Sequence, residues 1–89
     1  MKYLIETPHT PQECMRALDE EMAKGPRALR IFNYGCKSGD HTGYAIVDAK
    51  NAAEAQSLVP GFLLHKARIV EVAVLTPDQI VSLHFTKAA

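Results

Sequence analysis

The sequence predicts an α+β domain in which helices cover one face of a four-stranded antiparallel sheet. Apolar runs rich in Val, Ile and Tyr alternate with segments that begin with helix-capping residues. Their order is strand, helix, strand, strand, helix, strand, followed by a short C-terminal helix. Since 89 residues can bury only one modest core, we predict one domain over residues 1–89.

The first strand and the first helix are predicted from the N-terminal part of the chain. Lys2–Thr7 is rich in β-forming residues and is followed by a proline, which predicts a strand. Thr10-Pro11-Gln12-Glu13 is a capping box: an N-cap hydroxyl, a proline at the first helical position and a Glu three residues after the cap. We therefore predict a helix over Pro11–Lys24, ended by Gly25-Pro26. Four residues recur at helical spacing and are expected on its inner face: Cys14, Ala17, Leu18 and Met22.

A β-hairpin is predicted in the middle of the chain. Two apolar runs, Leu29–Tyr34 and Tyr44–Ala49, flank a polar connection built from the turn formers Gly, Lys, Ser and Asp. The tip of this hairpin holds Cys36 and His41. It is the place where reactive side chains and turn chemistry coincide in the sequence.

The second half of the chain repeats the pattern of a capped helix followed by a strand. Asn51 with Glu54 is again a cap followed by a Glu, and it predicts a helix over Ala52–Val59. Ala67–Leu75 alternates as a strand does, and Thr76-Pro77 starts a short terminal helix. This βαββαβ order is that of the ferredoxin-like arrangement, with two helices on one face of the sheet.

Alternation along the predicted strands assigns residues to the two sheet faces. One set is nearly all aliphatic and is expected beneath the helices: Tyr3, Ile5, Leu29, Ile31, Ala45, Val47, Val70, Val72 and Val74. The other set mixes aromatic and charged residues and is expected on the open face: Leu4, Glu6, Arg30, Phe32, Tyr34, Tyr44, Ile46, Asp48, Ile69, Glu71 and Ala73. Monomers seldom expose so large an apolar patch. We therefore predict a homodimer that packs through Phe32, Tyr34, Tyr44 and Ile46 of this face.

Composition argues against two classes of partner. Ten basic and ten acidic residues cancel, so no overall field favours nucleic acid or an anionic membrane. Glu6, Asp48 and Glu71 on the predicted open face would also repel RNA phosphates.

We find no export signal and no apolar run of membrane-spanning length, so we expect a cytoplasmic protein whose two cysteines are reduced.

One segment resembles a known family. Residues 39–62 contain His41 ahead of Tyr44-Ala45-Ile46-Val47-Asp48, then Glu54-Ala55, and finally Leu58-Val59-Pro60-Gly61-Phe62. This stretch resembles muconolactone isomerase-like proteins, which are small members of the dimeric α/β-barrel superfamily. The resemblance implies a dimeric α/β barrel and proton-transfer chemistry. The isomerase pattern does not require Cys14 or Cys36, and some small proteins of the same superfamily are stress-associated or metal-binding.

The predicted topology brings several reactive side chains to one edge of the sheet. The first and second strands run in the same direction, so their C-terminal ends meet where the third and fourth strands begin. His9, Cys14, Cys36, His41 and His65 all lie near this edge. Our leading interpretation is a pocket for a small organic molecule, without a cofactor. His41 would be the general acid or base. The residues expected around the ligand are Tyr34, Cys36, Arg30, Tyr44 and His9.

Two other interpretations of the same edge stay open. In the first, the protein is a non-catalytic metal-binding or stress-response protein. His9, Cys36 and His41, with Cys14 as a further candidate, would then ligate a zinc-like or nickel-like ion. In the second, the protein is a structural or interaction module. Cys14 is then a small core residue and the histidines lie in surface loops.

Overall fold

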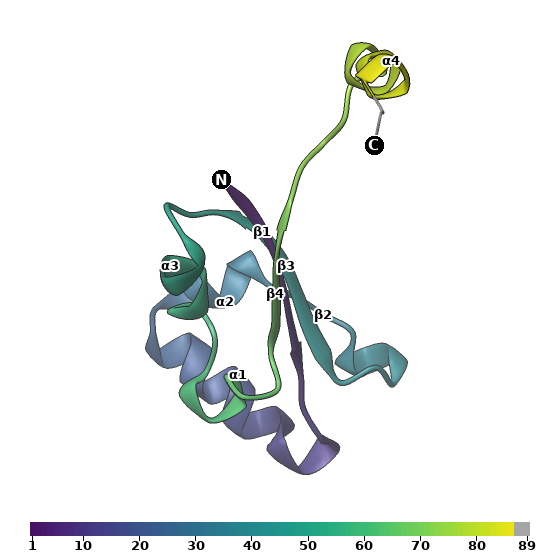
Figure 1. Cartoon of the computed structure of the whole chain (residues 1–89). Helices are drawn as coiled ribbons and strands as arrows, with labels where there is room; N and C mark the ends of the chain where they lie inside the picture. Colours follow the sequence, from purple (N-terminus) through teal and green to yellow (C-terminus); the bar gives the residue numbers. More distant parts are fainter. Residues whose placement is uncertain (87–89) are drawn as a thin grey trace.

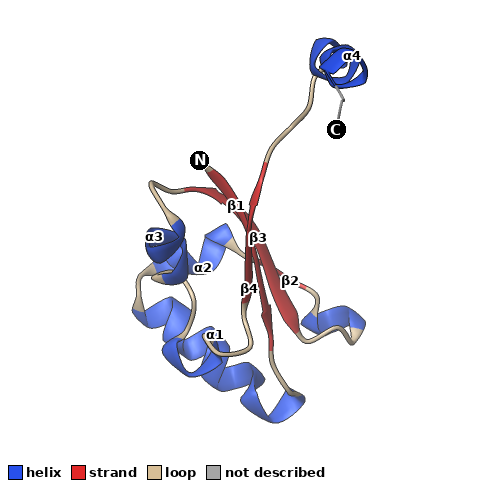
Figure 2. Cartoon of the chain, viewed as in Figure 1, coloured by secondary structure: helices blue, strands red, loops and turns tan. Residues whose placement is uncertain are grey.

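A computed structural model describes residues 1–86 and has the predicted α+β architecture (Figures 1 and 2). The strands are β1 (Lys2–Pro8), β2 (Asn33–Tyr34), β3 (Thr42–Asp48) and β4 (Arg68–Val72). The helices are α1 (Cys14–Ala23), α2 (Pro26–Ile31), α3 (Ala52–Gln56) and α4 (Pro77–Thr86), with single 3-10 turns at η1 (Pro11–Glu13), η2 (Cys36–Ser38) and η3 (Gly61–Leu63). The sheet order is β2-β3-β1-β4, every neighbouring pair is antiparallel, and α1, α2 and α3 lie on one face. This arrangement is compatible with the ferredoxin-like fold.

The core lies between the sheet and the helices. Ile5 and Leu63 are fully buried, and Ile5 stands opposite Ala45 on β3 and Ile69 on β4. Tyr3 and Ala45 are also buried, which confirms the predicted inner face of β1 and β3. Burial of these aliphatic side chains is the main force that holds the helices on the sheet.

The predicted strand over Leu29–Tyr34 is wrong for most of its length. Residues Pro26–Ile31 form α2, and only Asn33–Tyr34 pair with β3. Gly25 has a φ of 117°, and Pro26 follows it at the first helical position. Since Ala, Leu and Arg are strong helix formers, this start continues into a helix rather than a strand. Arg30 consequently lies on the exposed side of α2 instead of on a sheet face.

The predicted faces of β4 are also wrong, by one residue. Val70 and Val72 pair opposite Leu4 and Lys2, so they lie on the open face, whereas Ile69 lies on the helix side with Ile5. Because apolar residues occupy both parities of β4, alternation alone cannot choose between the two registers.

Two aromatic residues that were expected on the open face belong to the helix side. Phe32 is buried in the core, and Tyr34 packs against it with ring centroids 6.0 Å apart. Since α2 occupies the place of the predicted strand, Phe32 lies outside the sheet and its side chain is in the core. The predicted dimer surface therefore keeps Tyr44 and Ile46 but loses Phe32 and Tyr34.

The inner stripe of α1 contains a buried carboxyl group that the sequence analysis missed. The stripe runs through Cys14, Ala17, Leu18 and Glu21, whereas Met22 is exposed. Glu21 is 1% exposed, and neither carboxyl oxygen has a hydrogen-bond partner among the described residues. The Lys24 ammonium lies 3.5 Å from Oε1. Burial raises the pKa of Glu21, because the charged form loses its hydration.

As pH rises, we expect the free energy of unfolding to fall less in the Glu21→Gln variant than in wild type. A carboxyl whose folded pKa is raised stabilises the fold below its unfolded pKa, and this contribution is lost as pH rises through the folded pKa. The effect is at most about 1.4 kcal/mol per pH unit for one proton. Urea unfolding at about pH 5 and about pH 8 measures it, with Glu20→Gln as control. Equal pH slopes in Glu21→Gln and wild type would contradict the expectation.

The predicted terminal helix is confirmed, but it stands apart from the body (Figure 1). Thr76 and Gln79 exchange hydrogen bonds at its start, as a capping pair does. The radius of gyration is 16.1 Å, against about 12 Å for a compact chain of this length.

None of the helices between residues 1 and 86 is long and apolar enough to cross a membrane.

Candidate metal centre

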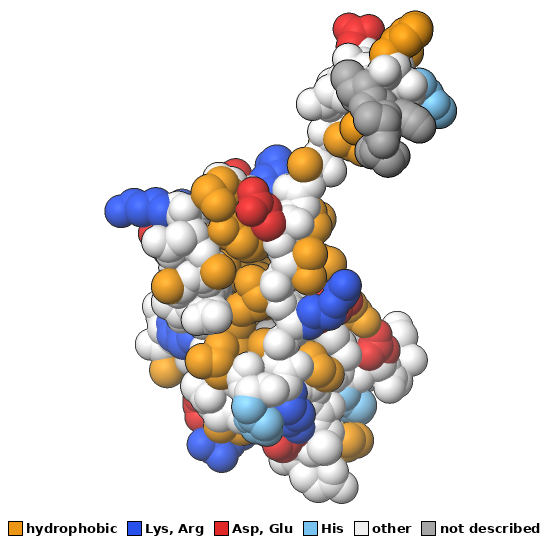
Figure 3. All heavy atoms as spheres, viewed as in Figure 1, with side chains coloured by type: hydrophobic (Ala, Val, Ile, Leu, Met, Phe, Trp, Pro, Cys, Tyr) orange, Lys and Arg blue, Asp and Glu red, His pale blue; other side chains and the backbone are white. Residues whose placement is uncertain are grey.

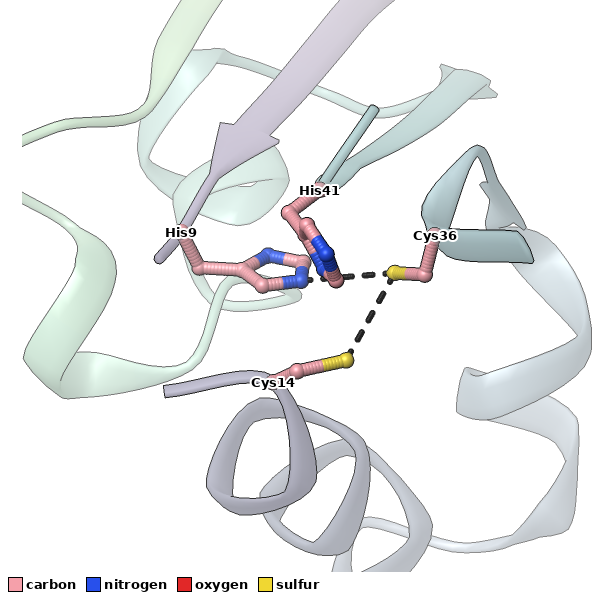
Figure 4. Close-up of side chains that lie close together, drawn as sticks. All are labelled: His9, Cys14, Cys36 and His41. Atoms are coloured by element: carbon pink, nitrogen blue, oxygen red, sulfur yellow. Dashed lines mark hydrogen bonds between the residues drawn. The ribbon is translucent and has the colours of Figure 1, made fainter. Parts of the chain in front are cut away.

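Four nitrogen- and sulfur-bearing side chains converge at one edge of the sheet (Figure 4). His9 follows β1, Cys14 begins α1, Cys36 begins η2 and His41 precedes β3. One ligand atom from each residue lies within 4.8 Å of the other three. The cluster could therefore hold a metal ion. It lies where Pro8 of β1 pairs with Thr42 of β3, which is the edge that the predicted topology indicated.

His9 is held in one orientation by its neighbours. Its backbone N–H donates to the His41 carbonyl at 2.9 Å, and its ring Nδ1 is 3.0 Å from the Thr7 carbonyl oxygen. A carbonyl can only accept, so Nδ1 carries a proton, and in the neutral ring the lone pair is on Nε2. Nε2 lies 3.4 Å from the Cys36 sulfur. A backbone carbonyl on the second ring nitrogen is the usual support of a metal-ligating histidine.

Cys14 is positioned by the start of its helix. Thr10 and Glu13 form both hydrogen bonds of the predicted capping box. The Lys66 ammonium lies 2.7 Å from the Glu13 carboxylate and, with the Thr10 backbone N–H, lowers the pKa of Glu13 to about 2. The sulfur of Cys14 lies 3.6 Å from that of Cys36.

A tight loop brings Cys36 and His41 together. The Gly35 N–H donates to the Thr42 carbonyl, and the Asp40 N–H donates to the Gly35 carbonyl. A Cβ on Gly35 would lie 2.8 Å from the Asp40 carbonyl oxygen, so this close approach requires glycine. The loop therefore depends on backbone contacts that a larger residue would break.

Two of the distances between donor atoms are close to those around a tetrahedral ion. Zn–S bonds of about 2.3 Å and Zn–N bonds of about 2.05 Å require S···S near 3.8 Å and S···N near 3.6 Å. The two distances measured here, 3.6 Å between sulfurs and 3.4 Å between Cys36 and His9, are close to these values. Since the four ligand atoms are spread over as much as 4.8 Å, the side chains would draw closer together around a bound ion.

One buried polar atom of the cluster has no hydrogen-bond partner in the described part of the chain. His41 Nδ1 is buried and has no hydrogen-bond partner within residues 1–86. His9 and His41 meet edge to face, with ring centroids 5.8 Å apart. Burial raises the pKa of the Cys36 thiol, and the adjacent Cys14 raises it further. A bound divalent cation would reverse this effect, because it stabilises the thiolate.

The other predicted site residues are dispersed. Tyr34 lies near the cluster, and its pKa is raised by burial and then by Glu21 and the two thiols. The Tyr44 hydroxyl donates to the Asp40 carboxylate, which lowers the pKa of Asp40. Tyr44 is on the open face, Arg30 is on the exposed side of α2, and His65 is exposed outside the cluster.

A groove of about 510 Å³ lies near the C-terminal end of β3, between α2 and α3. Its lining includes Arg27, Ile31, Asp48 and Leu58. None of the residues predicted to bind a small molecule lines this groove. The predicted pocket near His41 therefore stays a prediction.

Comparisons with protein-family models, curated proteins and solved structures found no match for this chain. The resemblance of residues 39–62 to muconolactone isomerase-like proteins is accordingly a prediction without support from relatives. Function has to be argued from the site itself.

Proposed function

We propose that the protein binds a zinc-type transition-metal ion through His9, Cys14, Cys36 and His41. The observation that carries the proposal is the convergence of four nitrogen and sulfur donors from four separate chain segments within 4.8 Å. The buried Nδ1 of His41, which has no hydrogen-bond partner among the described residues, supports the proposal as well, because a bound ion could satisfy it.

The donor set favours zinc over the harder divalent ions. Two thiolates and two imidazoles form a common tetrahedral zinc set, whereas magnesium and calcium prefer oxygen ligands. Nickel is the second candidate that the sequence suggested, but it often prefers a square-planar arrangement. The mixed set of two sulfur and two nitrogen donors therefore supports zinc.

Four protein ligands would complete the coordination shell. A catalytic zinc site usually keeps one position for water or substrate, and this set leaves none. The proposed role is therefore binding of the ion, with the gain in stability that binding brings, rather than hydrolysis. In the metal-bound protein His41 would be a ligand, so it could not also serve as the acid or base of an isomerase.

The proposal is tested by measuring metal content and ligand dependence together. Protein purified without affinity metals or chelators should contain, or take up, one zinc ion per chain. Cys36→Ser and His41→Gln should each weaken zinc binding by roughly 10²-fold or more, since each removes one of four ligands. His65→Gln is the matched control, because His65 is exposed and outside the cluster.

Cobalt substitution gives a second measurement, since tetrahedral thiolate-bound cobalt absorbs strongly in the visible range. Wild-type protein that does not bind zinc, or binding that survives both ligand variants, would refute the proposal.

A further inference from the structure

We propose that α4 is an arm exchanged between two copies of this chain. In a two-fold symmetric homodimer, each α4 would pack on the open sheet face of the other copy. This inference is independent of the metal site, since it depends on residues at a different part of the fold. The proposed dimer would cover two surfaces that are exposed in the single chain, namely α4 and the open face of the sheet.

The first surface is α4 itself. Ile80, Val81, Leu83 and Phe85 are exposed, and Phe85 reaches 85%. The helix has ten residues, and isolated helices of fewer than about 12 residues are marginal in water. A short helix so rich in apolar side chains needs a packing surface to be stable. Figure 3 shows hydrophobic side chains on the projecting helix as well as on the body.

The second surface is the open face of the sheet. Leu4, Val70 and Val72 lie on it, and Ile46 at its centre is 65% exposed. The charged groups around this apolar strip neutralise one another. The Lys2 ammonium is 3.9 Å from the Asp48 carboxylate, and the Arg68 guanidinium is 3.2 Å from the Glu6 carboxylate. An apolar helix could therefore cover the strip without burying an unpaired charge.

The linker directs the arm away from its own sheet. Residues 73–76 contain no glycine, and Thr76 precedes Pro77, which disfavours the helical conformation there and favours an extended one. A fold-back onto the same face would need a reversal of direction within these four residues, none of which is a strong turn former. The radius of gyration, larger than that of a compact chain, shows the resulting extension.

A second copy is the partner that fits both surfaces. Each copy carries one arm and one open face, so two-fold symmetry would bury both arms and both faces at once. The chain has a net charge of zero, so two copies do not repel each other at long range.

The test uses the full-length protein and two substitutions at exposed positions. Wild type should sediment as a species of twice 9.8 kDa at micromolar concentration. Phe85→Lys on the arm and Ile46→Glu on the open face should each raise the dimer dissociation constant at least about 100-fold, because each substitution acts twice in a symmetric dimer. Met22→Lys is the matched control, since Met22 is an exposed apolar residue on the helix layer.

Mixing the two variants tests whether the arm crosses between chains. In the mixed dimer one arm and one face are unchanged and meet each other, while the introduced lysine and glutamate meet at the other contact. The mixture should therefore associate more tightly than either variant alone. A monomeric wild type with a scattering radius near 12 Å would overturn the proposal, because α4 would then cover its own sheet. A dimer that persists in Phe85→Lys would overturn it as well.

Discussion

Zinc should raise the midpoint of thermal unfolding of the metal-free protein by roughly 15–30 °C. A ligand present at about 1,000 times its dissociation constant stabilises the native state by about 4.1 kcal/mol, provided that it does not bind the unfolded chain. Each kcal/mol shifts the midpoint by about 4–8 °C in a domain of this size. The four proposed ligands come from positions 9, 14, 36 and 41, so an unfolded chain does not hold them close together. Calorimetry with and without chelator measures the shift.

The ligand residues supply the control for this experiment. The double variant Cys14→Ser, Cys36→Ser should unfold at the same temperature with and without zinc, because it lacks both thiolates. His65→Gln should keep the full zinc-induced shift. If the double variant responds to zinc as wild type does, the ion binds elsewhere and the proposed centre is wrong.

The affinity for zinc should rise with pH. In the metal-free protein burial raises the pKa of Cys36 above its ordinary value, so the contribution of the protonated thiol to stability is lost only in the alkaline range. In the zinc-bound protein both thiols must lose their protons, so the apparent affinity rises with pH. The increase is up to about 100-fold per pH unit below the two thiol pKa values. Zinc titrations between about pH 6 and about pH 8 would show this slope.

Leu63→Ala should destabilise the protein by about 2–5 kcal/mol, the usual cost of truncating a buried leucine. Leu63 is fully buried in the core, in the turn that leads to β4. Truncation leaves a cavity beneath the helices, because the close-packed neighbours relax only partly. Urea unfolding of the metal-free protein measures the loss of free energy.

The next residue along the chain is the matched control. Leu64 has the same side chain but is 43% exposed, so Leu64→Ala should cost less than about 1 kcal/mol. Equal losses in the two variants would mean that Leu63 does not belong to the core as described.

The element order followed from the sequence because it depends on local chemistry. The Thr10–Glu13 capping box and the Asn51 cap each act within four residues, and both are formed as predicted. The alternation of β1 was also sufficient, since Lys2 and Glu6 mark one of its faces as the open one. Residue order further indicated that His9, Cys36 and His41 share an edge of the sheet, because antiparallel pairing dictates which strand ends meet.

Only the tertiary structure decided where locally ambiguous segments lie. Residues 29–31 suit a helix or a strand, and the structure places them in α2. β4 is apolar on both faces, so pairing with β1 chose its register. Glu21 has a charged side chain that sequence patterns place in water, yet the packing of α1 buries it. The placement of Cys14 beside Cys36 depends on how α1 docks on the sheet. Contacts between residues so far apart in the chain are set by the shape of the packed layers, which no local pattern encodes.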